Sequence, residues 1–186
     1  TEMVRAILDG RKVCTRRVIK HNVGAILNSP YHMEHPEVED AWLIKKLCRP
    51  PYEPGDILYV RETWCGLPVN EAGHFRGHPI YYYKADGDLR PEGWRGAWHP
   101  SIHMPKEAAR IWLKVTDVRV ERLQDMTDDD AEAEGCFDYS STALGFFDVW
   151  DSTIKKSDRD RYGWTANPWV WVIQFERCGK PEEVRR

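Results

Sequence analysis

The sequence predicts an α+β fold, in which short helices surround a small, mostly antiparallel β-barrel. Its 186 residues fit one domain, and a hydrophobic content of 41% is enough to form a core. The expected elements follow the order helix, strands, helix, strand, without the regular strand–helix alternation of parallel sheets. Short strands in that order favour an antiparallel barrel. We expect a single domain over 1–186, with loop insertions rich in Pro, Gly, His and Trp near 20–38, 65–79 and 86–105.

The first half of the chain begins with a helix. Residues 2–9 place apolar side chains on one face, Thr1 can cap this helix, and Gly10 can end it. A second helix is expected at 39–48, because the prolines that follow it cannot continue a helix. The turn Pro54-Gly55-Asp56 then introduces a strand from Ile57 to about Thr63.

The second half contains the longest strands. Residues 78–85 (HPIYYYKA) predict a strand, and residues 109–123 predict a long strand, or two that meet at a kink near Thr116-Asp117. An acidic helix over 127–135 would be capped by its first residue and ended by its glycine, and residues 146–154 are expected to be helical. Residues 167–177 (NPWVWVIQFER) predict a closing strand that is buried on both faces in its first half.

The composition narrows the classes of function. A net charge of -3 excludes a generally basic nucleic-acid coat protein, so anion binding would depend on a local cluster, and residues 11–20 are the densest one. Nine Trp, eight Tyr and five Phe can supply stacking surfaces for flat ligands. Five cysteines without a C-x-x-C pair indicate reduced thiols. With no signal peptide and no apolar run of membrane-spanning length, we expect a cytoplasmic protein that does not contact a membrane.

A glutamate interrupts an apolar strand face. Side chains alternate along a strand, so in ILYVRETW the inner face would contain Leu58, Val60, Glu62 and Trp64. A buried carboxylate must be paired, protonated or in contact with a wet pocket. We expect Glu62 to pair with Lys12 or with an arginine of the segment ILDGRKVCTRRVIK (7–20), either in an active site or as a structural ion pair.

Two residues with reactive side chains, Lys12 and Thr15, follow Gly10. In a tight turn the two side chains can meet, whereas on a strand they diverge. A threonine hydroxyl becomes a nucleophile when a base takes its proton, and a lysine can be that base when burial or nearby cations lower its pKa. Glu62 would then donate a proton to a leaving amine or hold the lysine. The alternative is an exposed basic turn that binds phosphate. The catalytic candidates are Lys12, Thr15 and Glu62, and the supporting, ligand-binding cations are Arg11, Arg16 and Arg17.

Six further residues are candidates for ligand contacts: Trp64, Tyr82, Trp94, Trp98, Ser101 and His103. The aromatic rings could stack on a base, and the serine and histidine would supply polar lining. Packing in the core or in a lid is the alternative for each aromatic residue. Two histidine pairs have i, i+4 spacing but lie among Gly and Pro, where no helix would bring them together, and no cysteine lies at ligand spacing. We therefore expect neither a metal nor a cofactor.

The segment GRKVCTRR, residues 10–17, resembles the signature G-x-K-x-x-T-x-R of ASCH domains, which are small β-barrels of the PUA-like superfamily. The resemblance covers most of the chain apart from the loops. PGDILYVRETW (54–64) looks like the strand with the family's acidic residue, residues 109–135 continue the match, and NPWVWVIQFER looks like the closing strand. WHPSIHMPKEAARI (98–111) is similar to a form associated with phage and prophage members.

This resemblance implies a cleft that binds RNA or a modified base. Some small ASCH proteins are amidohydrolases that remove the acetyl group from N4-acetylcytidine with a threonine, a lysine and a glutamate, which the motif places at Thr15, Lys12 and Glu62. The first hypothesis is therefore hydrolysis of an amide on a modified pyrimidine nucleoside. The alternatives are a non-catalytic module that binds RNA or a modified base, and a ribonuclease. This chain is longer than the small amidohydrolases and lacks their short strand before the first helix, which bears on substrate identity more than on the pocket.

Overall fold

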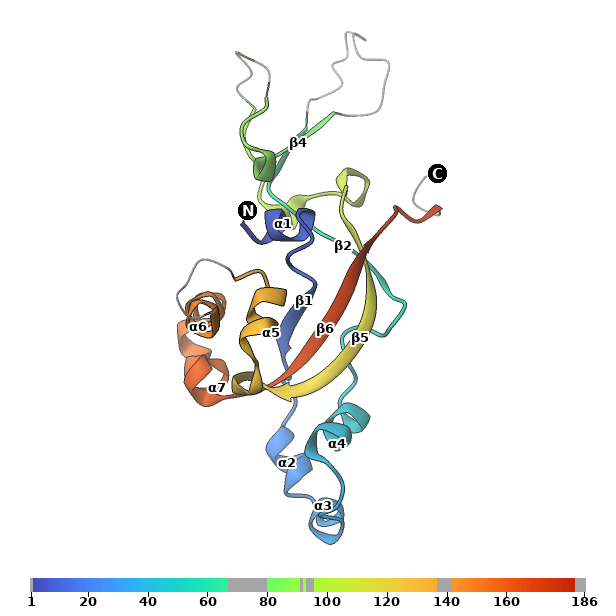
Figure 1. Cartoon of the computed structure of the whole chain (residues 1–186), viewed down its shortest axis with the longest axis vertical. Helices are drawn as coiled ribbons and strands as arrows, with labels where there is room; N and C mark the ends of the chain where they lie inside the picture. Colours follow the sequence, from blue (N-terminus) through green and yellow to red (C-terminus); the bar gives the residue numbers. More distant parts are fainter. Residues whose placement is uncertain (1, 67–79, 91, 93–95, 137–141, 183–186) are drawn as a thin grey trace.

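The computed structural model describes residues 2–66, 80–90, 92, 96–136 and 142–182, with the backbone alone for 142–144. The described part combines a curled antiparallel sheet with several helices (Figure 1), which confirms the mixed α and β content predicted from the sequence. The insertion expected at 65–79 lies almost entirely outside the described residues. None of the helices in the described part combines the length and the apolarity that a bilayer span requires.

The main sheet has four antiparallel strands in the order β1-β6-β5-β2. They are β1 (Cys14–Val18), β6 (Trp169–Cys178), β5 (Trp112–Arg122) and β2 (Ile57–Tyr59). β5 and β6 form the long central pair, and a register shift between Val115 and Asp117 confirms the predicted kink. β1 and β2 are the two edges, and no pairing joins them among the described residues. The described sheet is therefore open where a closed barrel would continue.

The expected strand from Ile57 to Thr63 is divided, so the prediction of one continuous strand is wrong. β2 ends at Tyr59, which is opposite Trp112, the first residue of β5. Beyond this point the chain changes its partner, and β3 (Trp64–Gly66) pairs instead with β4 (Tyr81–Tyr83) in a separate two-stranded sheet. The break occurs where β5, the partner of β2, begins. The sequence of residues 57–63 alone does not show where that partner strand begins.

Four predicted helices are confirmed: α1 (Glu2–Leu8), α4 (Asp40–Leu47), α5 (Asp128–Ala133) and α6 (Thr142–Thr153). A fifth short helix, α7 (Arg159–Tyr162), follows α6. Single 3₁₀ turns lie at Lys84–Asp86, Ser101–His103, Lys106–Ala108, Leu123–Asp125, Lys156–Asp158 and Trp164–Ala166.

The segment 20–38, expected to be a loop, contains two short helices, α2 (Val23–Leu27) and α3 (Pro30–Glu34). Each begins with a side-chain cap, because Asn22 accepts a hydrogen bond from the third residue after it and Ser29 does the same. Proline at the first position of α3 suits a helix start, where its missing N–H would have no partner. The loop prediction is wrong here because these local caps outweigh the Pro, Gly and His content.

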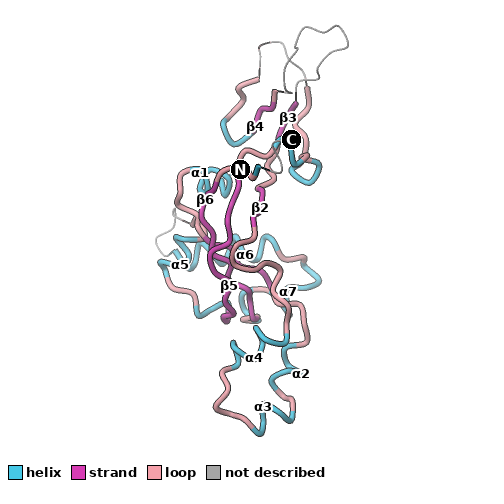
Figure 2. The backbone as a smooth tube through the Cα atoms, turned by 90° about the vertical axis from the view of Figure 1, so that its right-hand side faces the viewer, coloured by secondary structure: helices cyan, strands magenta, loops and turns pink. Residues whose placement is uncertain are grey.

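Helices cover both faces of the sheet. Ile173 of β6 belongs to an apolar cluster with Ile44 of α4, whereas its neighbour Val172 belongs to one with Phe146 and Trp150 of α6. This arrangement explains why β6 is apolar on both faces, as predicted. Figure 1 shows α5 and α6 beside the sheet and α2–α4 at one end of the molecule, and Figure 2 shows β3 and β4 at the opposite end.

Candidate functional site

A cavity of about 320 Å³ lies between the two edges of the main sheet, and we refer to it as the edge cavity. Its walls come from β1, from Val60 and Arg61 directly after β2, and from helices α1 and α6. Glu134, at the end of α5, also lines it. Because β1 is an edge strand, side chains from both of its faces can reach the cavity.

Lys12 and Thr15 both line the edge cavity. The chain is already a β-strand from Cys14 onward, so the tight turn that would bring the two side chains together is not formed. Strand alternation places Thr15 and Arg17 on the opposite face of β1 from Cys14 and Arg16. In the described part of the chain, no hydrogen bond joins Lys12 to Thr15. The two residues thus share a cavity, although no tight turn brings their side chains together.

The acidic partner of Lys12 is Glu134. Lys12 Nζ donates to Glu134 Oε2 at 2.6 Å and to the Glu134 carbonyl oxygen at 2.7 Å. The two side chains are only 10% and 5% exposed, so their attraction is screened less than that of a surface pair. Sequence reasoning missed Glu134 because it belongs to an acidic helix whose charges the helix dipole explains. Its position directly before Gly135, where the helix ends, is a signal that could have singled it out.

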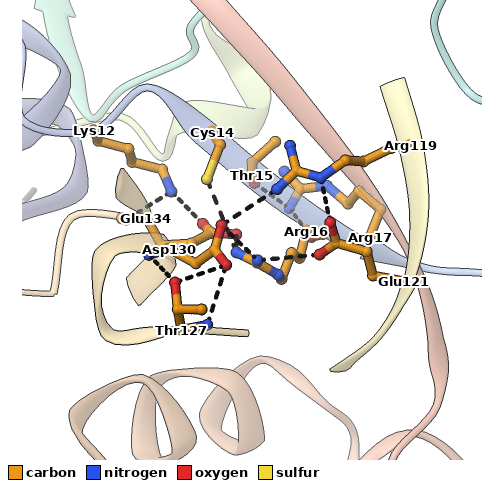
Figure 3. Close-up of polar contacts among 10 residues, drawn as sticks. All are labelled: Lys12, Cys14, Thr15, Arg16, Arg17, Arg119, Glu121, Thr127, Asp130 and Glu134. Carbon is orange, nitrogen blue, oxygen red and sulfur yellow. Dashed lines mark hydrogen bonds and ion pairs between the residues drawn. The ribbon is translucent and has the colours of Figure 1, made fainter. Parts of the chain in front are cut away.

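Arg16 is the centre of a buried ion cluster. Its guanidinium lies 3.4 Å from Glu134 Oε1, 3.3 Å from Asp130 Oδ1 and 3.5 Å from Glu121 Oε2, and its side chain is 0% exposed (Figure 3). Asp130, in the first turn of α5, and Glu134, at its end, are four residues apart, so one side of the helix presents both carboxylates to the same guanidinium. Arg119 joins the cluster through Glu121 and Asp130. Arg16 lines the edge cavity, but carboxylates already surround its guanidinium, so its role as a ligand-binding cation stays a prediction.

Burial and charge shift the pKa values of two groups in this cluster. Burial, together with the nearby Glu134 carboxylate, raises the pKa of the Cys14 thiol to about 12. Burial alone would also raise the pKa of Asp130, but hydrogen bonds from Thr127 and the charge of Arg16 hold it below its ordinary value of 3.8. At neutral pH, Cys14 is therefore a thiol and Asp130 a carboxylate.

Arg17 is exposed at the edge cavity and holds Thr15. Its Nη1 donates to Thr15 Oγ1 at 2.8 Å and to the carbonyl oxygen of Arg16 at 2.9 Å. The Thr15 hydroxyl consequently accepts from a cation in this state, and its own proton is not engaged by Lys12. Arg11, which was expected to support the same site, pairs with Asp9 at 2.9 Å and is not among the residues that line the edge cavity.

Glu62 is buried and paired, as the strand alternation indicated, but its partner is Arg110 and not Lys12. Two hydrogen bonds of 2.9 Å join the Arg110 guanidinium to the two carboxylate oxygens of Glu62. Arg110 also binds Asp86 at 2.7 and 2.9 Å and lies 4.0 Å from the ring centre of Tyr83. Burial alone would lower the pKa of Arg110, but the bonds to Glu62 and Asp86 raise it above its ordinary value. The expected Glu62–Lys12 pair is corrected, since Arg110 is 48 residues away and only the fold brings it close.

Glu62 and Ser101 line a second, smaller cavity of about 100 Å³. The other predicted ligand contacts lie elsewhere. Trp64 packs against Tyr81 and His99, with ring centres 5.7 and 5.0 Å away, and Arg90 lies 4.6 Å above Trp98. Tyr82 is paired with Cys65 between β3 and β4, and His103 ends a 3₁₀ turn. The structure lines the edge cavity with none of Trp64, Tyr82, Trp98 or His103, and Trp94 lies outside the described residues.

The aromatic wall of the edge cavity is formed instead by Phe146 and Trp150 of α6. Their rings are 5.9 Å apart, and Trp150 Nε1 donates to the Tyr162 carbonyl oxygen at 2.8 Å, which fixes the indole. The i, i+4 spacing places both rings on one helix face, and this signal is present in the sequence. Met3 of α1 also lines the cavity. The site therefore combines an apolar wall with a polar end.

Among the residues that the structure describes, no group of three or more His, Cys, Asp or Glu side chains is arranged to hold a metal ion. Comparisons of the chain with models of protein families, with curated proteins and with solved structures find no match.

Proposed function

We propose that the protein binds a modified pyrimidine nucleoside in the edge cavity and hydrolyses an amide on its base, and N4-acetylcytidine is the first substrate to test. The observation that supports this most is that Lys12 and Thr15 line one cavity in which Glu134 holds the lysine. We also propose that the open, curled sheet is a PUA-like barrel of the ASCH type, in keeping with the motif at residues 10–17.

The size and lining of the cavity suit such a ligand. Its volume of about 320 Å³ is at the lower end of the range, roughly 300–1,000 Å³, that small-molecule pockets occupy. Phe146, Trp150 and Met3 offer apolar surface to the flat face of a base. Lys12 and Thr15 then lie at the polar side of the cavity, where the amide of the substrate would be placed.

The proposed reaction begins at the Lys12–Glu134 pair. Lys12 passes a proton to Glu134 Oε2, and the resulting amine takes the proton of Thr15 as Oγ1 attacks the amide carbon. The new C–O bond forms a tetrahedral intermediate. Its C–N bond then breaks, and Lys12 returns the proton to the leaving nitrogen, which releases cytidine. Water hydrolyses the acetyl ester on Thr15, and Lys12 relays the proton of that water to Oγ1 before Glu134 returns the first proton.

This scheme gives Glu134 the role that the resemblance assigns to Glu62. Glu134 lines the edge cavity and lies within hydrogen-bonding distance of Lys12, whereas Glu62 is bound to Arg110 at the smaller cavity. The scheme also requires Thr15 to leave its hydrogen bond with Arg17, and the Lys12 amine to reach Thr15 Oγ1, when substrate binds.

The test is incubation with N4-acetylcytidine, followed by mass spectrometry for cytidine. We expect turnover by the wild-type protein and losses of about 100-fold or more for Lys12→Met, Thr15→Val and Glu134→Gln, since each removes a group that moves a proton or attacks. Glu62→Gln is the matched control and should retain turnover. A wild-type protein without turnover, or full activity in Thr15→Val, would overturn the hydrolase proposal.

A second candidate is a non-catalytic module that binds a modified base. The observation in its favour is that the Thr15 hydroxyl accepts a hydrogen bond from Arg17, while Lys12 is engaged by Glu134. Such a module would bind N4-acetylcytidine and release it unchanged. Equilibrium binding without product, measured on the same samples, would select this candidate over the first.

A further inference from the structure

Two arginines at the edge cavity have positive charges that no carboxylate neutralises within the described part of the chain. Arg17 and Arg61 both line the cavity, and both are exposed. Arg17 donates to the Thr15 hydroxyl at 2.8 Å and to the Arg16 carbonyl, and Arg61 donates to the Ile102 carbonyl at 3.3 Å. Neither arginine forms an ion pair with a described Asp or Glu. Their charges are thus available to a ligand.

The cations deeper in the site differ from this pair. Lys12 is bound to Glu134, and three carboxylates surround Arg16. Arg119 adds a third cation to this cluster, so its charges balance, and the excess positive charge lies at the exposed arginines. A neutral nucleoside would leave those two guanidinium groups without an anionic partner.

The positions of the two arginines favour joint binding of one anion. Arg17 belongs to β1, one edge of the sheet, and Arg61 follows β2, the other edge, so the two edges of the sheet each contribute one arginine to the same cavity. A guanidinium presents parallel N–H donors that match two oxygens of a phosphate, and its charge strengthens both hydrogen bonds. Two such groups on either side of an opening form a site for a phosphate attached to a ligand inside.

We propose that the ligand of the edge cavity is a nucleotide, and that Arg17 and Arg61 bind its phosphate. This inference rests on the proposed function, because the base must occupy the cavity for the phosphate to reach these arginines. The phosphate can be that of a free nucleoside monophosphate or of a nucleotide within a short RNA strand, since both present the same oxygens to the guanidinium groups.

The test compares cytidine with cytidine 5′-monophosphate, neither of which contains an amide to hydrolyse. Isothermal titration calorimetry on the wild-type protein should give at least about tenfold tighter binding of the nucleotide, with an advantage that shrinks as KCl rises. Arg17→Gln and Arg61→Gln should each reduce this advantage, and the double variant should abolish it, while cytidine binding stays the same. The matched control is Arg177→Gln, an exposed arginine that also donates to a backbone carbonyl but does not line the edge cavity.

A short cytidine-containing oligonucleotide distinguishes the two sources of phosphate. Tighter binding than the monophosphate indicates a strand, and equal or weaker binding indicates a free nucleotide. Equal affinity for cytidine and its monophosphate, or an advantage that survives in the double variant, would overturn the inference. If the inference fails in this way but N4-acetylcytidine is turned over in the same preparation, the proposed function stands without the inference. If the protein binds neither cytidine nor its monophosphate and does not turn over N4-acetylcytidine, both the inference and the proposed function are overturned.

Discussion

At the scale of single residues, burial decides what each charge can do. The segment GRKVCTRR, residues 10–17, contains four cations that look equivalent in the sequence, yet the structure separates them. Lys12 and Arg16 are buried and balanced by carboxylates, while Arg17 is exposed at the edge cavity. A buried charge without a partner costs several kcal/mol, so the buried cations need the acids that α5 and β5 supply.

Glu62 illustrates the same point, and its role can be tested by stability. Replacing it in Glu62→Gln removes one partner of the buried pair with Arg110, whose remaining carboxylate is Asp86. We expect a loss of about 3 kcal/mol, the lower end of the range for broken buried pairs, because Asp86 keeps part of the compensation. Urea unfolding measures this change.

The exposed pair of Arg5 and Glu2 provides the comparison for this prediction. Glu2→Gln removes a carboxylate of the same type from a surface ion pair, where screening leaves little net attraction. Its urea midpoint should stay close to that of the wild-type protein. A Glu62→Gln midpoint equally close to wild type would show that the buried pair is not stabilising.

At the scale of elements, α5 positions the acidic side of the site. Thr127 and Asp130 form a capping box that fixes its start, and Gly135, with φ 94°, ends it directly after Glu134. The positive φ suits glycine, because other residues adopt this backbone only at a cost. A helix fixed at both ends holds Asp130 and Glu134 in the register that Arg16 and Lys12 require.

Gly135→Ala tests this positioning. The added Cβ would lie 3.1 Å from the Ala6 Cβ and 3.3 Å from the Lys12 Cβ, in addition to the strain at φ 94°. We expect a loss of stability of about 1–3 kcal/mol from the backbone strain. We also expect nucleoside binding or turnover to weaken further, because Lys12 must shift. Thermal unfolding and the N4-acetylcytidine assay measure the two effects.

Gly10→Ala is the matched variant for that experiment. Gly10 also has a positive φ, 75°, but a Cβ there would have no atom within 4 Å. The Gly10→Ala variant should lose about as much stability as Gly135→Ala and keep the ligand affinity of the wild-type protein. Equal losses of affinity in both variants would contradict the proposed link between Gly135 and Lys12.

At the scale of the whole molecule, the edge cavity exists because the sheet curls and stays open. β1 and β2 are the two edges of one sheet, and the residues on and after them form opposite walls. Helices α1 and α6 complete the enclosure, and the long central strands β5 and β6 support both walls. Among the described residues, the edge cavity thus lies where strand pairing does not join β1 to β2.

The ion cluster that joins β1, β5 and α5 makes the stability of the molecule depend on pH. The pKa of Asp130 is lower in the folded state than its ordinary value of 3.8, so the carboxylate stabilises the fold above that pH. This contribution is lost as the pH falls through the lower, folded-state value. Urea unfolding at a series of pH values should show stability declining below about pH 4. Asp130→Asn should be less stable at pH 7 and show a smaller decline; an unchanged decline would contradict the assignment.

Local patterns were enough to predict α1, α4, α5, α6, β5 and β6. Their signals are caps, glycine stops and apolar periodicity, and all of these act between residues close in the sequence. The side-chain caps of α2 and α3 are equally local, and the expectation of a loop at 20–38 overlooked them. The sequence also showed the spacing of Lys12 and Thr15, and the alternation of strand side chains predicted that Glu62 points inward.

The partners of these residues depended on the tertiary structure. Lys12 and Glu134 are 122 residues apart, and Glu62 and Arg110 are 48 apart, so the distance between their charges follows from strand register and helix packing. The chain also enters β1 at Cys14, so the tight turn that the spacing of Lys12 and Thr15 allowed is not formed. A sequence specifies which charges will need a partner once buried, because desolvation acts on each residue. Which partner each one meets is decided by the packing of segments that are far apart along the chain.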